Sequence, residues 1–155
     1  MLCVWWDFGG IIHWELLPPK QTVTSVVYCE QLDRVHHKLV ESRPSLVNRK
    51  GVILLHDNAR PHVSNMTQDK ICELGWEVLS HPPYSPDMAP TDYHLFRSLH
   101  HHTSGKTYEN LEGLEMDITL FFKQKKPEFF LNGINNLIER WTYIINNNGK
   151  YFIDK

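Results

Sequence analysis

The sequence predicts an α/β domain with a helical C-terminal part, and three features carry that prediction. Residues 51–57, GVILLHD, form a continuous apolar run of strand length, which is typical of a strand covered on both faces. Residues 76–79, WEVL, form a second short strand after a helical segment, and the strand–helix–strand order implies parallel pairing. The apolar positions beyond residue 92 recur at helical spacing.

The N-terminal third predicts a hairpin followed by a helix. Residues 2–6 and 11–17 are aromatic and β-branched runs, and a short segment with two glycines joins them as a β-hairpin. A helical pattern then covers residues 24–43, with Thr24 as its N-cap and Pro44 as its stop.

The middle of the chain predicts the centre of a sheet. We expect 51–57 to be the central strand and 59–74 to be one helix that ends at Gly75. Residues 80–92, SHPPYSPDMAPTD, contain four prolines and predict a stiff loop.

Three helices are predicted after this loop. Thr91 is expected to cap a helix that opens at Asp92. The next helix is marked by Leu111, Leu114, Ile118 and Phe121. The last helix begins at Pro127 and ends before Gly149. The side chains expected to face the core are Phe130, Ile134, Leu137, Trp141 and Ile144.

Composition narrows the class of protein. With 155 residues, 41% of them hydrophobic, we expect one domain over residues 1–155 with a packed core. A net charge of −2 gives no global signal for nucleic acid, although a site made of carboxylates would offset basic residues that hold phosphates. The three cysteines contain no CxxC, and no apolar run reaches membrane-spanning length, so we expect an intracellular, soluble protein without a disulfide framework.

Histidines occur in two runs, His36 with His37 and His100 with His101 and His102. Adjacent histidines on a helix point to different faces, and no cysteine or acid completes a tetrahedral set. We therefore expect surface roles for them and no zinc site.

Two carboxylates are candidates for a metal site. Asp57 follows a predicted parallel strand at its carboxyl end, where ligands collect in open α/β sheets, and Asp92 lies in the first turn of a predicted helix. Such carboxylates could hold Mg²⁺ or Mn²⁺ for phosphodiester chemistry. Local physics leaves a second reading open, in which Asp57 caps the helix near Ala59 and Asp92 stabilises a helix N-terminus.

Several motifs resemble the catalytic domain of mariner-family transposases, of the Tc1/mariner superfamily. They are VWWD at 4–7, HDNARPH at 56–62, GWEVLSHPPYSPDMAPTDYHLF at 75–96, NNLIERW at 135–141 and NNGKYF at 147–152. The resemblance implies an RNase H-like mixed sheet with flanking helices, three metal-binding aspartates, Mg²⁺ or Mn²⁺ as cofactor without a small-molecule cofactor, and a nuclear protein that binds DNA and works as a homodimer, with no membrane partner.

The resemblance also assigns the carboxylates. Residues 58–91 lie between Asp57 and Asp92, which is the 34-residue separation of the family's second and third aspartates. By this spacing Asp87 is a neighbouring turn residue and not a ligand. The family's first aspartate lies upstream of the segment that matches MLCVWWD, and Asp7 follows a different strand and does not replace it.

These implications predict an incomplete site. The family's first strand lies in the centre of the sheet, so a chain without it would leave two unpaired strand edges and would be marginal, or would close the gap by a non-native contact. We expect a truncated catalytic domain with little or no activity of its own. The N-terminal helix-turn-helix region of such transposases is not expected here either. Intact relatives cut and join DNA.

Two alternatives remain open from the sequence. The chain could be an inactive DNA-binding or dimerising remnant, as in host-retained SETMAR-like proteins, where such a domain is fused to a methyltransferase. Asn58, Arg60 and His62 could orient DNA or a nucleophile, or could serve only in capping and loop hydrogen bonds.

Overall fold

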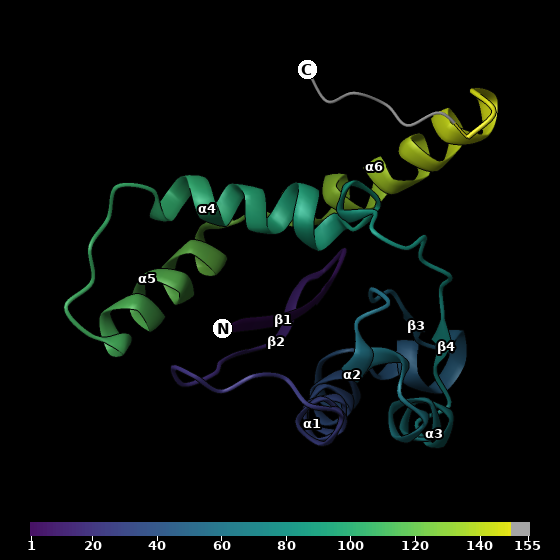
Figure 1. Cartoon of the computed structure of the whole chain (residues 1–155), viewed down its shortest axis with the longest axis horizontal. Coiled ribbons are helices and arrows are strands. Elements are labelled where there is room, and N and C mark those ends of the chain that lie inside the picture. The colour runs from purple at the N-terminus through teal and green to yellow at the C-terminus, as the bar shows by residue number, and fades with distance from the viewer. Residues whose placement is uncertain (150–155) are drawn as a thin grey trace. The chain divides into compact units, whose positions relative to one another are not determined.

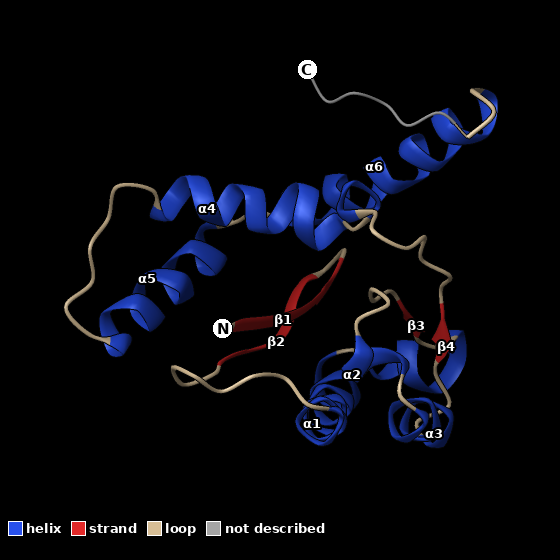
Figure 2. Ribbon diagram, viewed as in Figure 1, coloured by secondary structure: helices blue, strands red, loops and turns tan. Residues whose placement is uncertain are grey.

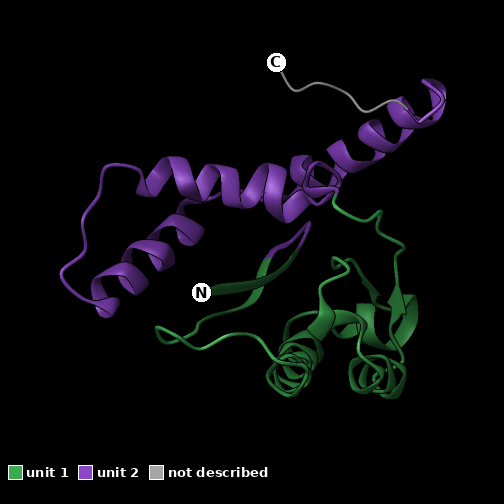
Figure 3. Cartoon of the chain, in the orientation of Figure 1, with its two compact units in different colours: residues 1–6, 11–84 green, residues 7–10, 85–155 purple. Residues whose placement is uncertain are grey.

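The computed structural model describes residues 1–149 and divides the chain into two compact units. The first unit comprises residues 1–6 and 11–84, and the second comprises residues 7–10 and 85–155 (Figure 3). Strands occur in the N-terminal part, and residues 85–149 are helical apart from their loops (Figure 2). The predicted α/β class is therefore confirmed.

The predicted hairpin is present. Strands β1 (Leu2–Asp7) and β2 (Gly10–Leu16) pair in a two-stranded sheet. At the open end, the Leu17 N–H donates to the Met1 carbonyl at 2.8 Å, and the Met1 ammonium group donates to the Leu17 carbonyl at 3.2 Å. At the turn, the Asp7 Oδ1 accepts from the Gly9 N–H at 2.8 Å, so Asp7 stabilises the reversal of the chain.

Helix α1 (Ser25–Ser42) confirms the helical pattern and its cap. The Thr24 hydroxyl accepts from the Val27 N–H at 3.3 Å and satisfies one of the free donors at the helix start. Glu15 of β2 joins the hairpin to this helix. Its carboxylate accepts from Gln31 Nε2 at 3.1 Å and from Arg34 Nη2 at 3.1 Å. A π-helical turn, η1 (Leu46–Lys50), follows α1.

The parallel pairing is confirmed, but the predicted central strand is not. Strand β3 (Ile53–Leu54) pairs in parallel with β4 (Glu77–Val78), with Ile53 opposite Glu77. The strand is two residues long, although 51–57 was expected, and Ile53 is 63% exposed whereas Leu54 is 9% exposed. Within residues 1–149, β3 has a single partner strand, so its other edge is unpaired.

The predicted helix 59–74 is two helices, α2 (Arg60–Val63) and α3 (Asn65–Glu73). The break falls at Ser64, whose backbone is extended and whose hydroxyl accepts from the Thr67 N–H at 3.3 Å. The prediction of one helix was wrong because this serine caps a new helix instead of continuing the first.

The predicted end at Gly75 is confirmed. The Gly75 N–H donates to the Cys72 carbonyl at 3.0 Å, and the Trp76 N–H donates to the Ile71 carbonyl at 3.1 Å. This paired arrangement needs a left-handed residue, and Gly75 supplies it with φ of +69°.

The core of the first unit forms between α1, α3 and the β3–β4 pair. Helices α1 and α3 lie side by side (Figure 1). The buried core side chains are Tyr28, Leu32, Val35, Leu39, Val52, Leu54, Ile71 and Trp76.

The second unit begins with a 3₁₀ turn, η2 (Pro86–Met88), and a π-helical turn, η3 (Thr91–Phe96), which continues as α4 (Arg97–Thr103). The expectation that Thr91 caps this helix was wrong, because Thr91 already lies inside it. The Ala89 carbonyl accepts from the N–H groups of Asp92 at 2.9 Å and Tyr93 at 3.1 Å. Pro90 fits a first helical turn, where its fixed φ is favourable and its missing N–H costs nothing.

Both C-terminal helices are confirmed. Helix α5 (Leu111–Gln124) is capped by Asn110, whose Oδ1 accepts from the Gly113 N–H at 2.9 Å. Helix α6 (Pro127–Asn146) opens at its proline and is followed by Gly149 with φ of +80°. The last part of the NNGKYF motif, residues 150–152, lies outside the described residues. No helix among residues 1–149 is long and apolar enough to span a bilayer.

The core of the second unit is built by these helices. Its buried side chains are Met88, Leu95, Leu99, Ile118, Phe121, Phe122, Phe130 and Leu137. The Lys125 Nζ lies 4.3 Å from the ring centroid of Phe121 and 4.5 Å from that of Phe129, so its charge faces two aromatic rings.

Candidate functional site

Asp57 lies three residues beyond β3, at the carboxyl end of the parallel pair. Its side chain is 58% exposed. The Oδ1 atom accepts from the Ala59 N–H at 3.0 Å and from His62 Nδ1 at 2.6 Å, so His62 carries a proton on Nδ1. Partial burial disfavours the charged form, but these two hydrogen bonds outweigh it and lower the pKa of Asp57. The carboxylate is thus held ionised, and its Oδ2 has no hydrogen-bond partner among the described residues.

The sequence left open that Asp57 has only a local structural role, as the cap of the helix near Ala59. The structure shows a local role for one of its two oxygens, although not as a helix cap. The bond to Ala59 closes a turn ahead of α2, but the side chain does not cap that helix. The His62 bond reaches further, to a residue inside α2. One oxygen therefore serves the turn, and the other remains available to a ligand.

The His62 ring belongs to an aromatic cluster with Tyr28 and His56. The Tyr28 ring lies 4.2 Å from the His62 ring, and the His56 ring lies 5.2 Å from His62 with an interplanar angle of 7°. The Tyr28 hydroxyl lies 3.0 Å from His56 Nδ1. Burial, followed by the neighbouring Asp57, raises the pKa of Tyr28, so the hydroxyl keeps its proton and donates to His56. Burial, with His62 close by, lowers the pKa of His56 to about 4, so His56 is neutral near pH 7.

Asn58 and Arg60 are placed differently from His62. Asn58 Nδ2 donates to the His81 carbonyl at 2.9 Å and ties the loop after β3 to the loop after β4. Arg60 opens α2 with an exposed side chain that makes no hydrogen bond or ion pair among the described residues. Asn58 thus performs the loop hydrogen bonding that one reading expected, and Arg60 is exposed to solvent.

A cavity of about 580 Å³ opens beside these residues, within the first unit. It borders the segments that follow β3 and β4, where α/β sheets place their ligands, and it extends along α3 to Trp76. Its polar wall is formed by His56, Asn58, His62 and His81, and its apolar wall by Val63, Ile71, Trp76, Val78 and Leu79.

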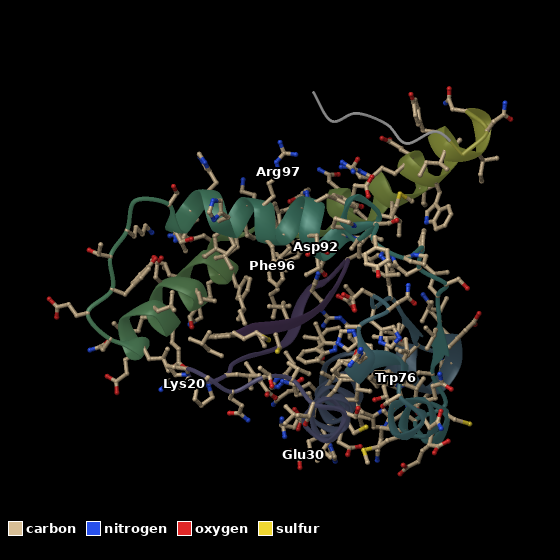
Figure 4. The ribbon with its side chains drawn as sticks, in the orientation of Figure 1. Lys20, Glu30, Trp76, Asp92, Phe96 and Arg97 are labelled. Carbon is tan, nitrogen blue, oxygen red and sulfur yellow. The ribbon has the colours of Figure 1, made fainter. Side chains whose placement is uncertain are left out.

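Asp92 belongs to the second unit and is exposed. It lies in η3, near Phe96 and Arg97 on the same helical segment (Figure 4). The Asp92 carbonyl accepts the Arg97 N–H, which makes the turn π-helical. A carboxylate in the first helical turn is favoured in its ionised form by the free N–H groups there. Asp87 lies in the preceding 3₁₀ turn, as its assignment to a turn predicted.

The donors suit a hard divalent cation, but the described residues do not complete a site. Asp57 offers an ionised oxygen ligand of the kind that Mg²⁺ and Mn²⁺ take. Within residues 1–149, no group of three or more histidine, cysteine, aspartate or glutamate side chains is arranged to hold an ion. Asp57 therefore fits as one ligand of a larger set.

The histidine run in the second unit has another partner. His102 Nε2 lies 3.0 Å from Asp117 Oδ1, and Tyr108 donates to Asp117 Oδ2 at 2.6 Å. Lys106 Nζ lies 3.0 Å from Asp117 Oδ1. Hydrogen bonds from Tyr108 and Lys106 lower the pKa of Asp117 to about 2. This cluster closes the loop between α4 and α5.

The contacts of Tyr28, His81 and Arg140 were not foreseen from the sequence. Tyr28 was assigned only to the apolar stripe of its helix, and nothing in the sequence pairs it with His56, which lies 28 residues further on. Arg140 occurs inside a motif that was noted, NNLIERW, but its partners Asp87 and Tyr93 lie on either side of Asp92 in the sequence.

Comparison with known proteins places the chain in a family. Residues 1–49 match the family described as transposase (partial DDE domain). The human histone-lysine N-methyltransferase SETMAR is 46% identical over 152 residues, which are 98% of this chain and 22% of that protein. The mariner Mos1 transposase of Drosophila mauritiana is 41% identical over 152 residues, which are 97% of this chain and 44% of that protein. The chain thus spans less than half the length of either relative.

Solved structures agree with the sequence relatives. The crystal structure of the Mos1 mariner transposase catalytic domain has a TM-score of 0.94 and 42% identity, and the match covers 98% of this chain and 75% of that one. The Mos1 paired-end complex with Mn has a TM-score of 0.93 and 41% identity, over 98% of this chain and 44% of that one.

The fold is therefore that of the RNase H-like catalytic domain of DDE-type transposases. At this level of identity over nearly its whole length, the chain belongs to the mariner family of transposases.

Proposed function

We propose that this chain contributes Asp57 and Asp92 to a metal-dependent site that cleaves and joins DNA strands in transposition. The observation that carries the proposal is the state of Asp57, which is ionised, exposed and open at Oδ2 at the carboxyl end of β3. The family membership supports it, because the Mos1 structures include a pre-cleavage transpososome and a strand transfer complex. Mos1 catalytic-domain structures were also solved with Mg and with Mn.

Each residue has a defined part in this proposal. Asp57 and Asp92 would hold Mg²⁺ or Mn²⁺, which when bound polarises a phosphodiester and activates water or a 3′-hydroxyl. The Ala59 N–H and His62 keep Asp57 charged and fix its Oδ1, so that Oδ2 is directed by the protein and not by solvent. Asn58 holds the neighbouring loop, and Arg60 offers an exposed cation to a DNA phosphate.

We propose further that the third carboxylate comes from outside these 155 residues. In the family pattern it lies on a strand upstream of the segment that matches VWWD. With two of three ligands, the isolated chain would bind the ion weakly and show little or no cleavage. We also propose that the protein acts in the nucleus, where it binds DNA as a homodimer.

The test is nicking of supercoiled DNA in the presence of Mn²⁺. It compares the 155-residue chain with a form extended upstream by the family's first strand and aspartate. We expect nicking from the extended form, a loss of roughly 100-fold or more in Asp57→Asn and Asp92→Asn, and no loss in the control Asp87→Asn. Equal nicking by the extended form and its Asp57→Asn variant would overturn the site assignment. Nicking by the short chain that Asp57→Asn abolishes would overturn the need for a third carboxylate.

A second candidate function is DNA binding or dimerisation without cleavage. The observation that favours it is the 46% identity to SETMAR, a protein named for histone methylation. In that case the extended form would bind DNA, or would form dimers, as tightly as an active transposase domain does. It would not nick DNA with Mg²⁺ or Mn²⁺. Band-shift and sedimentation measurements beside the nicking assay distinguish the two.

A further inference from the structure

Helix α6 contacts the chain on both sides of Asp92. Arg140 Nη1 donates to the Asp87 carbonyl at 2.8 Å, five residues before Asp92. The guanidinium carbon of Arg140 lies 4.0 Å from the ring centroid of Tyr93, the residue directly after Asp92. One side chain therefore binds the segment that enters the Asp92 turn and the segment that leaves it.

Two more contacts from the same helix hold the departing segment. The Tyr93 hydroxyl donates to the Gly133 carbonyl at 2.7 Å. His94 Nε2 donates to the Phe129 carbonyl at 2.8 Å, and the two rings lie 4.2 Å apart. Burial raises the pKa of Tyr93 to about 12, although Arg140 opposes this, so the hydroxyl remains a donor at any working pH.

The Asp92 turn requires such support. It is a π-helical turn without a side-chain cap, and isolated π-helical turns have poor intrinsic stability. Their geometry persists where the surrounding structure determines it. Here the buried side chains of Met88 and Leu95 hold the segment at 1% and 0% exposure. The Arg140 contact with Tyr93 lies between them, and its contact with Asp87 directly precedes Met88.

We propose that Arg140 is a positioning residue that sets the orientation of the Asp92 carboxylate for metal binding. The proposal rests on the proposed function, since it takes Asp92 to be a ligand. A guanidinium suits the task because it is planar, and so can donate in its plane to Asp87 while its face stacks on Tyr93. A lysine carries the same charge and can donate, but it has no planar group to stack on Tyr93 while it donates to Asp87.

The experiment locates bound Mn²⁺ by NMR in the 155-residue chain. Paramagnetic Mn²⁺ broadens the amide signals nearest to it, so the broadening at residues 91–93 reports on Asp92 without any need for catalysis. We expect Arg140→Ala to require about tenfold more Mn²⁺ for the same broadening, which is the usual scale for losing a group that orients a ligand. Arg140→Lys should recover only part of the loss, and added methylguanidinium should restore Arg140→Ala further.

The controls separate the two proposals. Arg34→Ala also removes a paired guanidinium, but one that binds Glu15 in the first unit, and it should leave the broadening at Asp92 unchanged. Unchanged broadening in Arg140→Ala would overturn the positioning role. If instead Asp92→Asn leaves the broadening at 91–93 unchanged, the ligand role of Asp92 fails, and the proposed function fails with it.

If Arg140→Ala disturbs the folding of the second unit, two milder variants still test the positioning role. Should Arg140→Ala shift amide signals throughout α5 and α6, the comparison passes to Arg140→Lys and Tyr93→Phe. Tyr93→Phe loses the bond to Gly133 and keeps the ring that Arg140 stacks on. Weaker Mn²⁺ broadening in Arg140→Lys than in Tyr93→Phe supports the proposal, and the reverse order contradicts it.

Discussion

At the scale of single residues, the chemistry of Asp57 depends on two donors, the Ala59 N–H and the side chain of His62. His62 donates to Oδ1 at 2.6 Å, and its ring stacks on His56 and lies 4.2 Å from the tilted ring of Tyr28. Because these ring contacts restrict the His62 side chain, they hold its Nδ1 in position to donate to Asp57. The carboxylate is stabilised in its charged form although its surroundings are partly apolar.

His62→Leu is expected to raise the pKa of Asp57 toward its ordinary value. The charged carboxylate would lose its side-chain donor and keep only the Ala59 N–H, so protonation would begin at a higher pH than in the wild type. A ¹³C NMR titration of the Asp57 carboxyl group in metal-free buffer measures this. His81→Leu is the control, because its backbone carbonyl and not its ring takes part in the loop bond. An unchanged pKa in His62→Leu would show that the bond has no electrostatic role.

At the scale of elements, short-range hydrogen bonds decide where helices begin and end. Thr24, Ser64 and Asn110 each accept an N–H three residues ahead, and Gly75 closes α3 with a left-handed backbone. These signals are local, which is why both ends of α1 and the C-terminal end of α3 followed from the sequence. The break at Ser64 had the same kind of signal, but the helical pattern on both sides concealed it.

Gly75→Ala is expected to destabilise the protein by about 1 kcal/mol. No atom lies within 4 Å of the added methyl group, so the cost comes only from the positive φ of +69°. Gly113→Ala is the matched control. It lies in the first turn of α5, and its new methyl group would meet Asn110 Oδ1 at 3.4 Å, an ordinary contact. This variant should be as stable as the wild type or more so, by up to about 1 kcal/mol. Chemical denaturation followed by circular dichroism measures both, and equal effects of the two substitutions would contradict the backbone explanation.

At the scale of the whole molecule, the strands form only small sheets within residues 1–149. Four strands form two separate two-stranded sheets within residues 1–149, and β3 has a partner on one side only. Ile53 remains 63% exposed beside this unpaired edge. Such an edge can pair with another chain.

Ile53→Lys is expected to reduce self-association of the 155-residue chain. A charge on an edge strand opposes pairing with a second edge. Met116→Lys is the control, since Met116 is 70% exposed on α5 and lies on no strand. Sedimentation velocity at rising concentration measures the effect. If both variants reduce association equally, exposed apolar area is the cause and the strand edge is not.

The sequence by itself determined the α/β class, the order of elements, the parallel pair, the extents of α1 and α6, the presence of α5, and the family. It could do so because helical periodicity and caps act within a few residues, and because the motifs are long. Tertiary structure alone decided the shortness of β3, the cluster of Tyr28, His56 and His62 next to Asp57, and the contacts of Arg140 with Asp87 and Tyr93. Each of these depends on which distant segments meet in the folded chain, and that is a property of packing that no local pattern encodes.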